Sequence, residues 1–178
     1  IDLERSSDRD LVDILQRTPG VSAGGSGLDG VSIRGIGANA SGLVDIQIDG
    51  VSRIPNGFGA IDGLSTWDLD QVEILRGPQS TQQGQSALAG AIIVRSADPK
   101  FFNTSKFRAD YGSYNETRLA GMVNVAITDN IAVRFAAEDY STDGEAVDAA
   151  VSGRDNLRPK ESTTYRAKLR FQPTEQFN

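Results

Sequence analysis

The chain has 178 residues, a net charge of −6, no cysteine and no histidine. Without these two side chains, the usual nucleophilic and zinc chemistry of enzymes is missing its residues. An acidic balance without a basic cluster also argues against nucleic acid as a partner. We therefore expect a protein that is neither an enzyme nor a nucleic-acid binder, with no catalytic residues, no cofactor and no metal site.

Composition divides the chain into two parts. The first hundred residues carry most of the glycines but only two of the aromatic residues, and they contain 8 basic and 13 acidic residues. The rest of the chain carries ten Phe and Tyr residues, with 10 basic and 11 acidic residues. We place a boundary at Asp98 to Lys100 and expect two domains, in residues 1–99 and 100–178.

The first element expected is a short helix. Ser7 followed by Asp10 resembles a capping box, with Asp where Glu is usual. Apolar residues at helical spacing follow it, namely Leu11, Ile14 and Leu15. The sequence Thr18-Pro19-Gly20 then ends the helix, because proline and glycine disfavour its continuation.

Short strands with β-branched residues follow the helix. They are predicted at residues 31–35, 43–49, 70–75 and 91–95. In the second of these, Val44, Ile46 and Ile48 alternate with Asp45, Gln47 and Asp49, which predicts one apolar and one polar face. The polar segment from Ser52 to Ser65 is interpreted as a long loop. These features predict a small α+β domain with many loops.

The second part contains four longer segments that alternate apolar and polar residues, at 106–111, 117–128, 131–140 and 163–172. A tight turn joins the middle two, and about twenty polar residues, from 141 to 162, separate the last two. Strands of about 10 residues with unequal connections suit a membrane β-barrel. A soluble antiparallel sheet with one wet face produces the same alternation. The pattern alone leaves both readings open.

Three segments in the first part, taken in order, resemble the plug domain of TonB-dependent outer-membrane receptors. They are DLVDILQRTPGV at residues 10–21, VSIRGIG at 31–37 and DQVEILRGPQS at 70–80. VDIQIDGV at residues 44–51 and ALAGAIIV at 87–94 also match the family's pattern in order and spacing. The chain departs from that pattern at Gln82-Gln83, where the family usually has an apolar pair.

The resemblance implies an architecture. It is an α+β plug domain, with a small mixed sheet and short helices, followed by antiparallel transmembrane β-barrel strands that form an incomplete barrel. Four strands are fewer than the roughly eight that close a barrel. The resemblance also implies a TonB box and a first plug strand before Ile1. The expected location is the outer membrane of a Gram-negative cell, with the plug inside the barrel lumen.

The resemblance also implies a function, which is energy-coupled uptake of a scarce solute, most often a ferric siderophore. Cobalamin and glycans are the alternatives within the family. The implied partners are TonB with its inner-membrane energising complex at the periplasmic side, an extracellular small-molecule ligand and outer-membrane lipid. A soluble plug-like interaction module without a pore remains the competing reading, and an enzyme is the third.

Two groups of residues are candidates for a functional site. Arg34, Glu73 and Arg76 stand near strand ends beside glycines. The resemblance assigns these charges to the interface between plug and barrel, whereas the plain alternative is a set of solvated surface charges. The resemblance also implies that a plug loop near the outer surface contacts the ligand, and the candidates for this are Arg53, Asn56 and Phe58 in a polar loop, together with Trp67. An ordinary connection is the alternative for that loop.

Overall fold

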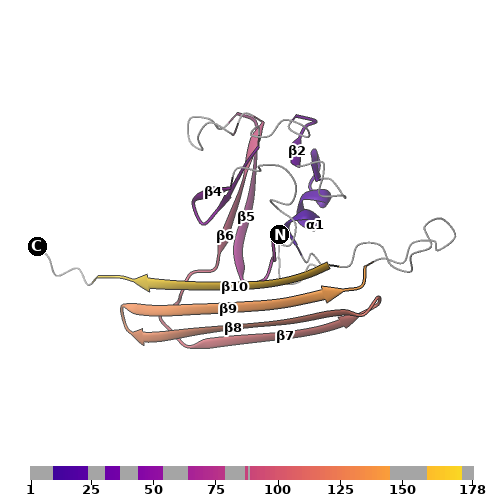
Figure 1. Cartoon of the computed structure of the whole chain (residues 1–178). Coiled ribbons are helices and arrows are strands. Elements are labelled where there is room, and N and C mark those ends of the chain that lie inside the picture. Colours follow the sequence, from indigo (N-terminus) through magenta and orange to yellow (C-terminus); the bar gives the residue numbers. More distant parts are fainter. Residues whose placement is uncertain are drawn as a thin grey trace, which may run out of the picture. The chain divides into compact units, whose positions relative to one another are not determined.

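The computed structural model describes residues 10–23, 31–36, 44–53, 64–78, 87, 89–144 and 160–173. The chain forms two compact units, Ile1–Ala97 and Asp98–Asn178. Unit 1 contains a helix, a small hairpin and a mixed sheet, and unit 2 contains a four-stranded sheet (Figure 1). Within these ranges no helix is long and apolar enough to cross a membrane.

Helix α1 spans Leu11–Arg17 and is fixed by a capping box. The Asp13 backbone N–H donates to Asp10 Oδ1 at 3.0 Å, and the Asp10 N–H donates to Asp13 Oδ2 at 3.5 Å. The predicted pairing of Ser7 with Asp10 was therefore wrong, because Asp10 is itself the N-cap. The predicted stop is confirmed, since the helix ends at Arg17 with Thr18 as its C-cap, and Gly20 takes a left-handed φ of 77°.

Strands β1, Val21–Ala23, and β2, Val31–Ile33, form a two-stranded antiparallel sheet. Strand β1 was not predicted, because three residues carry too little periodicity to stand out. Strand β2 is shorter than predicted. Arg34 and Gly35 both have positive φ, at 54° and 77°, and form a tight turn in which the backbones of Ile33 and Ile36 bond to each other.

The mixed sheet of unit 1 has the strand order β4-β3-β6-β5. Its strands are Val44–Ile48 (β3), Val51–Arg53 (β4), Leu69–Arg76 (β5) and Gly90–Ser96 (β6). The central pair, β3 and β6, is parallel, and both outer pairs are antiparallel. A central strand can be covered on both faces, and Asp45 is fully buried on β3. Asp45 and Gln47 share the face opposite Val44 and Ile46, as predicted, and their side chains bond to each other, but this face is covered rather than solvated at Asp45.

Asp49 and Gly50 join β3 to β4 in a turn where both have positive φ, at 50° and 81°. The Asp49 carboxylate accepts hydrogen bonds from Ser96 N at 2.9 Å and from Ser96 Oγ at 2.7 Å, which ties this turn to the end of β6. The predicted loop from Ser52 to Ser65 was wrong at its start, because the Asp-Gly turn closes a hairpin whose second strand is β4.

One buried apolar cluster holds unit 1 together. It draws on the helix, the hairpin and the sheet, and its most buried members are Leu11, Leu15, Ile33, Val44, Ile46, Ile92 and Val94. Each such side chain contributes about 1.5–3 kcal/mol on leaving water. The core therefore fixes where the strand ends and turns of unit 1 lie.

Unit 2 is an antiparallel sheet with the order β10-β9-β8-β7. All four alternating segments form strands, and they are slightly longer than predicted: Thr104–Gly112 (β7), Glu116–Thr128 (β8), Ile131–Thr142 (β9) and Lys160–Phe171 (β10). The tight connection between β8 and β9 is also confirmed. Apart from a shift between Ala126 and Thr128 of β8, register is continuous across the sheet, so residues facing the same way form rows over all four strands.

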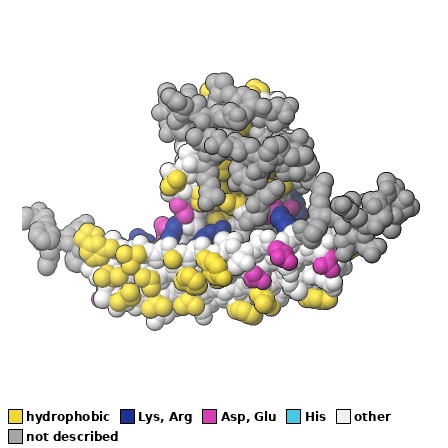
Figure 2. All heavy atoms as spheres, viewed as in Figure 1, with side chains coloured by type: hydrophobic (Ala, Val, Ile, Leu, Met, Phe, Trp, Pro, Cys, Tyr) yellow, Lys and Arg dark blue, Asp and Glu magenta, His cyan; other side chains and the backbone are white. Residues whose placement is uncertain are grey.

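The two faces of this sheet differ in chemistry. The apolar face carries large exposed side chains, namely Phe107, Tyr111, Leu119, Val123, Val125, Ile127, Phe135, Tyr165, Leu169 and Phe171. The polar face carries Lys106, Arg108, Arg118, Asn124, Arg134, Glu138, Arg166, Lys168 and Arg170. Figure 2 shows hydrophobic side chains gathered along the exposed surface of the sheet.

Candidate functional site

Arg34 lies at the tip of the turn after β2. Its backbone N–H donates to Gly20 O at 2.7 Å, which fixes the turn against the end of the helix. Its side chain is exposed. The structure therefore places this predicted site residue at a rigid, outward-pointing position of unit 1.

Glu73 and Arg76 lie on the edge strand β5, three residues apart, so their side chains leave opposite faces of the sheet. Glu73 is half-buried and accepts from Gln71 Nε2 at 2.8 Å, whereas Arg76 is exposed. Arg76 pairs in register with Gly90, and the side chain of Ile33, next to Arg34, reaches this glycine. The two arginines thus come from adjoining parts of unit 1, while Glu73 faces away from Arg76.

The predicted ligand-contact residues are only partly placed. Arg53 is the last residue of β4, and Asn56 and Phe58 lie outside the described residues. Trp67 is half-buried in the turn before β5, and its backbone N–H donates to Ser65 Oγ at 2.9 Å. Of this group the described part of the chain therefore places only Arg53 and Trp67, and ligand contact stays a prediction.

A buried ion pair on the polar face of unit 2 was not predicted from the sequence. Arg118 Nε donates to Glu138 Oε2 at 2.6 Å, and the two side chains are only 5% and 4% exposed. The pair joins β8 to β9 across a diagonal of the ladder, since Arg118 stands opposite Tyr140. Alternation placed both residues on polar faces, but only the strand register shows that they meet.

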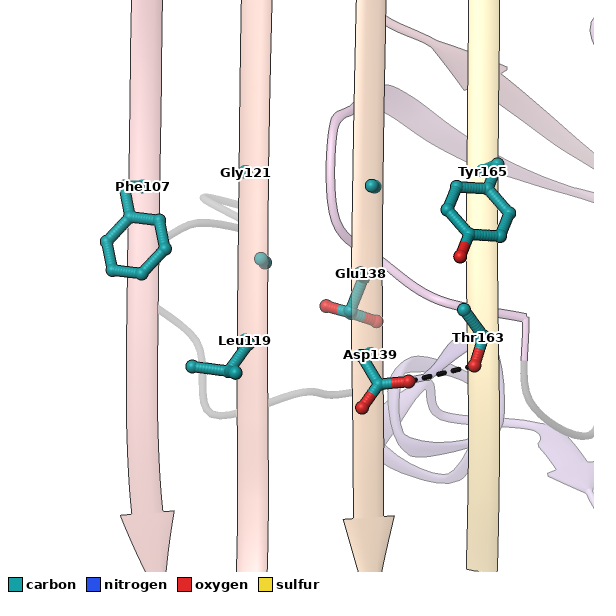
Figure 3. Close-up of a pocket in the computed structure, with 9 residues that line it drawn as sticks. Phe107, Leu119, Gly121, Glu138, Asp139, Thr163 and Tyr165 are labelled. Atoms are coloured by element: carbon teal, nitrogen blue, oxygen red, sulfur yellow. Dashed lines mark hydrogen bonds between the residues drawn. The ribbon is translucent and has the colours of Figure 1, made fainter.

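A shallow groove of about 320 Å³ lies on the apolar face. Phe107, Gly121, Ala137 and Tyr165 form a row across all four strands, with the two rings flanking two small residues (Figure 3). Asp139 accepts from Thr163 Oγ1 at 2.8 Å at one end of the groove. This carboxylate is satisfied by its neighbour, so the groove offers no convergent polar set for a soluble small molecule.

The described residues contain no group of three His, Cys, Asp or Glu side chains that could hold a metal ion. The buried carboxylate of Asp45 accepts from Gln47 Nε2 at 2.7 Å and from Ser52 Oγ, so it stabilises the β3–β4 hairpin.

Known proteins resemble the chain in sequence. It is 35% identical over 130 residues to the catecholate siderophore receptor Fiu of Escherichia coli K12, covering 70% of this chain and 16% of that protein. It is 30% identical over 127 residues to a ferrioxamine receptor of Yersinia enterocolitica, covering 68% of this chain and 18% of the relative. The chain therefore spans less than a fifth of the length of either relative.

Solved structures share the fold. The ferric yersiniabactin uptake receptor FyuA of Yersinia pestis matches with a TM-score of 0.80 and 23% identity, over 98% of this chain and 28% of that one. The closed form of Fiu matches with a TM-score of 0.74 and 29% identity, over 95% and 22%. The family model named "TonB-dependent Receptor Plug Domain" matches residues 2–91, just over half of the chain. The chain therefore belongs to the TonB-dependent receptor plug domain family.

Proposed function

We propose that this chain is the front part of a longer outer-membrane receptor that takes up a ferric siderophore with energy delivered through TonB. The observation that carries the ligand class is that the relatives 35% and 30% identical to the chain are both siderophore receptors. The chain corresponds to a small share of each. In this proposal residues 1–99 are the plug domain and residues 100–178 are the first strands of the barrel.

The membrane assignment is supported by the inverted burial of unit 2. In a soluble sheet, the apolar face is covered and the polar face is wet. Here Asn124 and Glu138 are buried at 1% and 5% exposure, while Phe107 and Tyr165 are 76% and 70% exposed. Because large apolar side chains gain about 1.5–3 kcal/mol each on leaving water, lipid is the natural partner of this face.

The candidate residues take their roles from this arrangement. With the plug inside the barrel lumen, Arg34, Glu73 and Arg76 would pair with barrel-wall charges that stay partly hydrated, and such pairs cost little to break. Arg53, Asn56, Phe58 and Trp67 would contact the ligand from the extracellular side. TonB would act from the periplasmic side. The solute is transported unchanged, so the protein is not an enzyme.

The main experiment expresses the full reading frame that carries this chain in cells lacking their own siderophore receptors. We expect uptake of radioactive iron supplied as a ferric siderophore of the ferrioxamine or catecholate class, and loss of uptake when TonB is deleted. Uptake of cobalamin or a glycan instead of iron would contradict the siderophore assignment and show that the ligand is one of the family's other substrates. Recovery of the protein in the soluble fraction would overturn the membrane assignment and favour the interaction module.

The charge roles have a separate test in the same full-length protein. Arg34→Ala and Arg76→Ala should reduce uptake while membrane insertion and expression stay unchanged. Arg95→Ala is the matched control, because Arg95 is an exposed arginine on β6 of the same unit. Uptake unchanged in both variants, or reduced equally by the control, would contradict the interface role.

A further inference from the structure

Six residues, Asp98–Asn103, lead into β7 and cross the polar face of the unit 2 sheet; we call them the strap. At its first end, Lys168 Nζ contacts Asp98 Oδ1 at 3.1 Å, and Arg170 Nη1 donates to Pro99 O at 3.4 Å. Both partners come from β10, at one edge of the sheet. The strap therefore begins at β10 and ends at β7, on the opposite edge.

The centre of the strap is held by one side chain, Asn124 of β8. Its Oδ1 accepts from the Lys100 backbone N–H at 2.9 Å, and its Nδ2 donates to Lys100 O and Phe102 O, both at 2.7 Å. Asn124 is 1% exposed. A neutral amide supplies both an acceptor and two donors, so neither a carboxylate nor an apolar side chain of similar size can make this set of bonds.

Further contacts hold the strap along its length. Asn103 Oδ1 accepts from Ala126 N at 2.9 Å, so a side chain continues the ladder just before Thr104, the first paired residue of β7. The Arg170 guanidinium stacks 5.1 Å from the centre of the Phe101 ring, and Pro99 is fully buried. Each of these contacts is within unit 2, so the strap is part of the sheet's own structure.

The strap follows directly on a residue that unit 1 holds. The Ala97 N–H donates to Asp68 O at 3.0 Å within unit 1, and the next residue, Asp98, is bound to β10. No free linker residue stands between these two contacts. A displacement of unit 1 must therefore be absorbed at Ala97 and Asp98 or by release of the strap. The Lys168 contact resists little because Asp98 is largely exposed.

We propose that Asn124 is a positioning residue that fixes the strap on the sheet, so that any rearrangement of the plug during transport ends at Ala97. This inference rests on the proposed transport function. Loss of the Asn124 side chain would leave three backbone groups of the strap without their hydrogen bonds. Asn124 is therefore the dominant contact of the strap. Without them, motion of the plug extends through the strap to the start of β7.

The structural arm of the test measures amide hydrogen exchange in the purified full-length receptor, without ligand. Asn124→Leu has a similar volume and no hydrogen bonds, and it should speed exchange of the Lys100 amide by about tenfold or more. Met122→Leu, at a buried position on the same face of β8, is the control and should leave it unchanged. Exchange in β8 and β9 reports that the sheet is intact. Equal Lys100 protection in wild type and Asn124→Leu would overturn the proposal.

Trypsin provides a second readout, because Lys100 is an exposed cleavage site whose backbone is held by Asn124. We expect cleavage after Lys100 in Asn124→Leu and resistance in the wild type and in Met122→Leu. Equal cleavage in all three proteins would contradict the proposal that Asn124 holds the strap on the sheet.

The functional arm compares ferric-siderophore binding and uptake in cells. We expect Asn124→Leu to bind the siderophore within about twofold of wild type, since the strap lies at the end of the sheet that carries the tight β8–β9 turn, but to lose most uptake. Uptake equal to wild type despite a mobile strap would overturn the positioning role. If the wild-type receptor itself takes up no ferric siderophore, the proposed function fails. The hydrogen-exchange and trypsin results still decide whether Asn124 holds the strap on the sheet.

Discussion

The substitution Gly90→Ala tests how unit 1 is assembled. Gly90 begins β6 with a φ of 156°, in a region that only glycine adopts readily. An added Cβ would lie 2.3 Å from Leu75 O on β5 and 2.6 Å from Ile33 Cδ1. Backbone strain costs about 1–3 kcal/mol, and overpacking adds about 1–3 kcal/mol. We therefore expect Gly90→Ala to lower the free energy of unfolding by about 4 kcal/mol.

Gly50→Ala is the matched control for this prediction. Gly50 has a φ of 81°, but an added Cβ would meet nothing within 4 Å, so the backbone strain acts alone and costs about 1–2 kcal/mol. Trp67 is the chain's single tryptophan and lies in unit 1, so its fluorescence follows unfolding of this unit. The assay is a urea titration of the chain in detergent micelles. If the urea concentration at the unfolding midpoint is no lower for Gly90→Ala than for Gly50→Ala, the argument from steric contact is refuted.

Other parts of the chain make further predictions. Glu138→Ala leaves Arg118 buried without its partner and should cost about 3–5 kcal/mol, whereas replacing both residues by apolar side chains should cost much less; thermal unfolding measures both. Asp49→Ala removes two bonds to Ser96 and should cost about 2–3 kcal/mol in the urea titration, more than Asp49→Asn. Val123→Lys should reduce insertion of the full-length protein into lipid vesicles, by about 2–4 kcal/mol if the side chain lies near the bilayer centre. Equal insertion would argue against lipid contact at this face.

Local sequence signals predicted most of the elements. The 3.6-residue spacing of Leu11, Ile14 and Leu15 and the stop at Thr18-Pro19-Gly20 are contained within ten residues, and the helix forms there. Period-two alternation over six or more residues predicted the four strands that the structure describes in unit 2. Strands β1 and β4, each three residues long, were missed because their stability comes from pairing with a neighbour rather than from their own pattern.

The sequence predicted the arrangement of the candidate site residues less well than it predicted the helix and the longer strands. Arg34 and Arg76 were selected from glycines beside strand ends, and the structure places them in adjoining parts of unit 1. Glu73 was grouped with them, yet strand alternation alone turns it to the other face from Arg76. Asp49 was interpreted as a product of alternation, whereas its carboxylate ties the β3–β4 turn to β6 from 47 residues away.

By itself, the sequence determined the family and the division into two parts, together with the helix, the longer strands and the two-faced character of the second sheet, because each of these depends on residues near one another in the chain. Only the tertiary structure decided which strands pair, that Asp45 is buried, that Arg118 meets Glu138 and that Asn124 holds the strap. The contacts of Arg118 and Asn124 join residues 20 or more positions apart, and their geometry depends on strand register, which no local pattern specifies to a single residue.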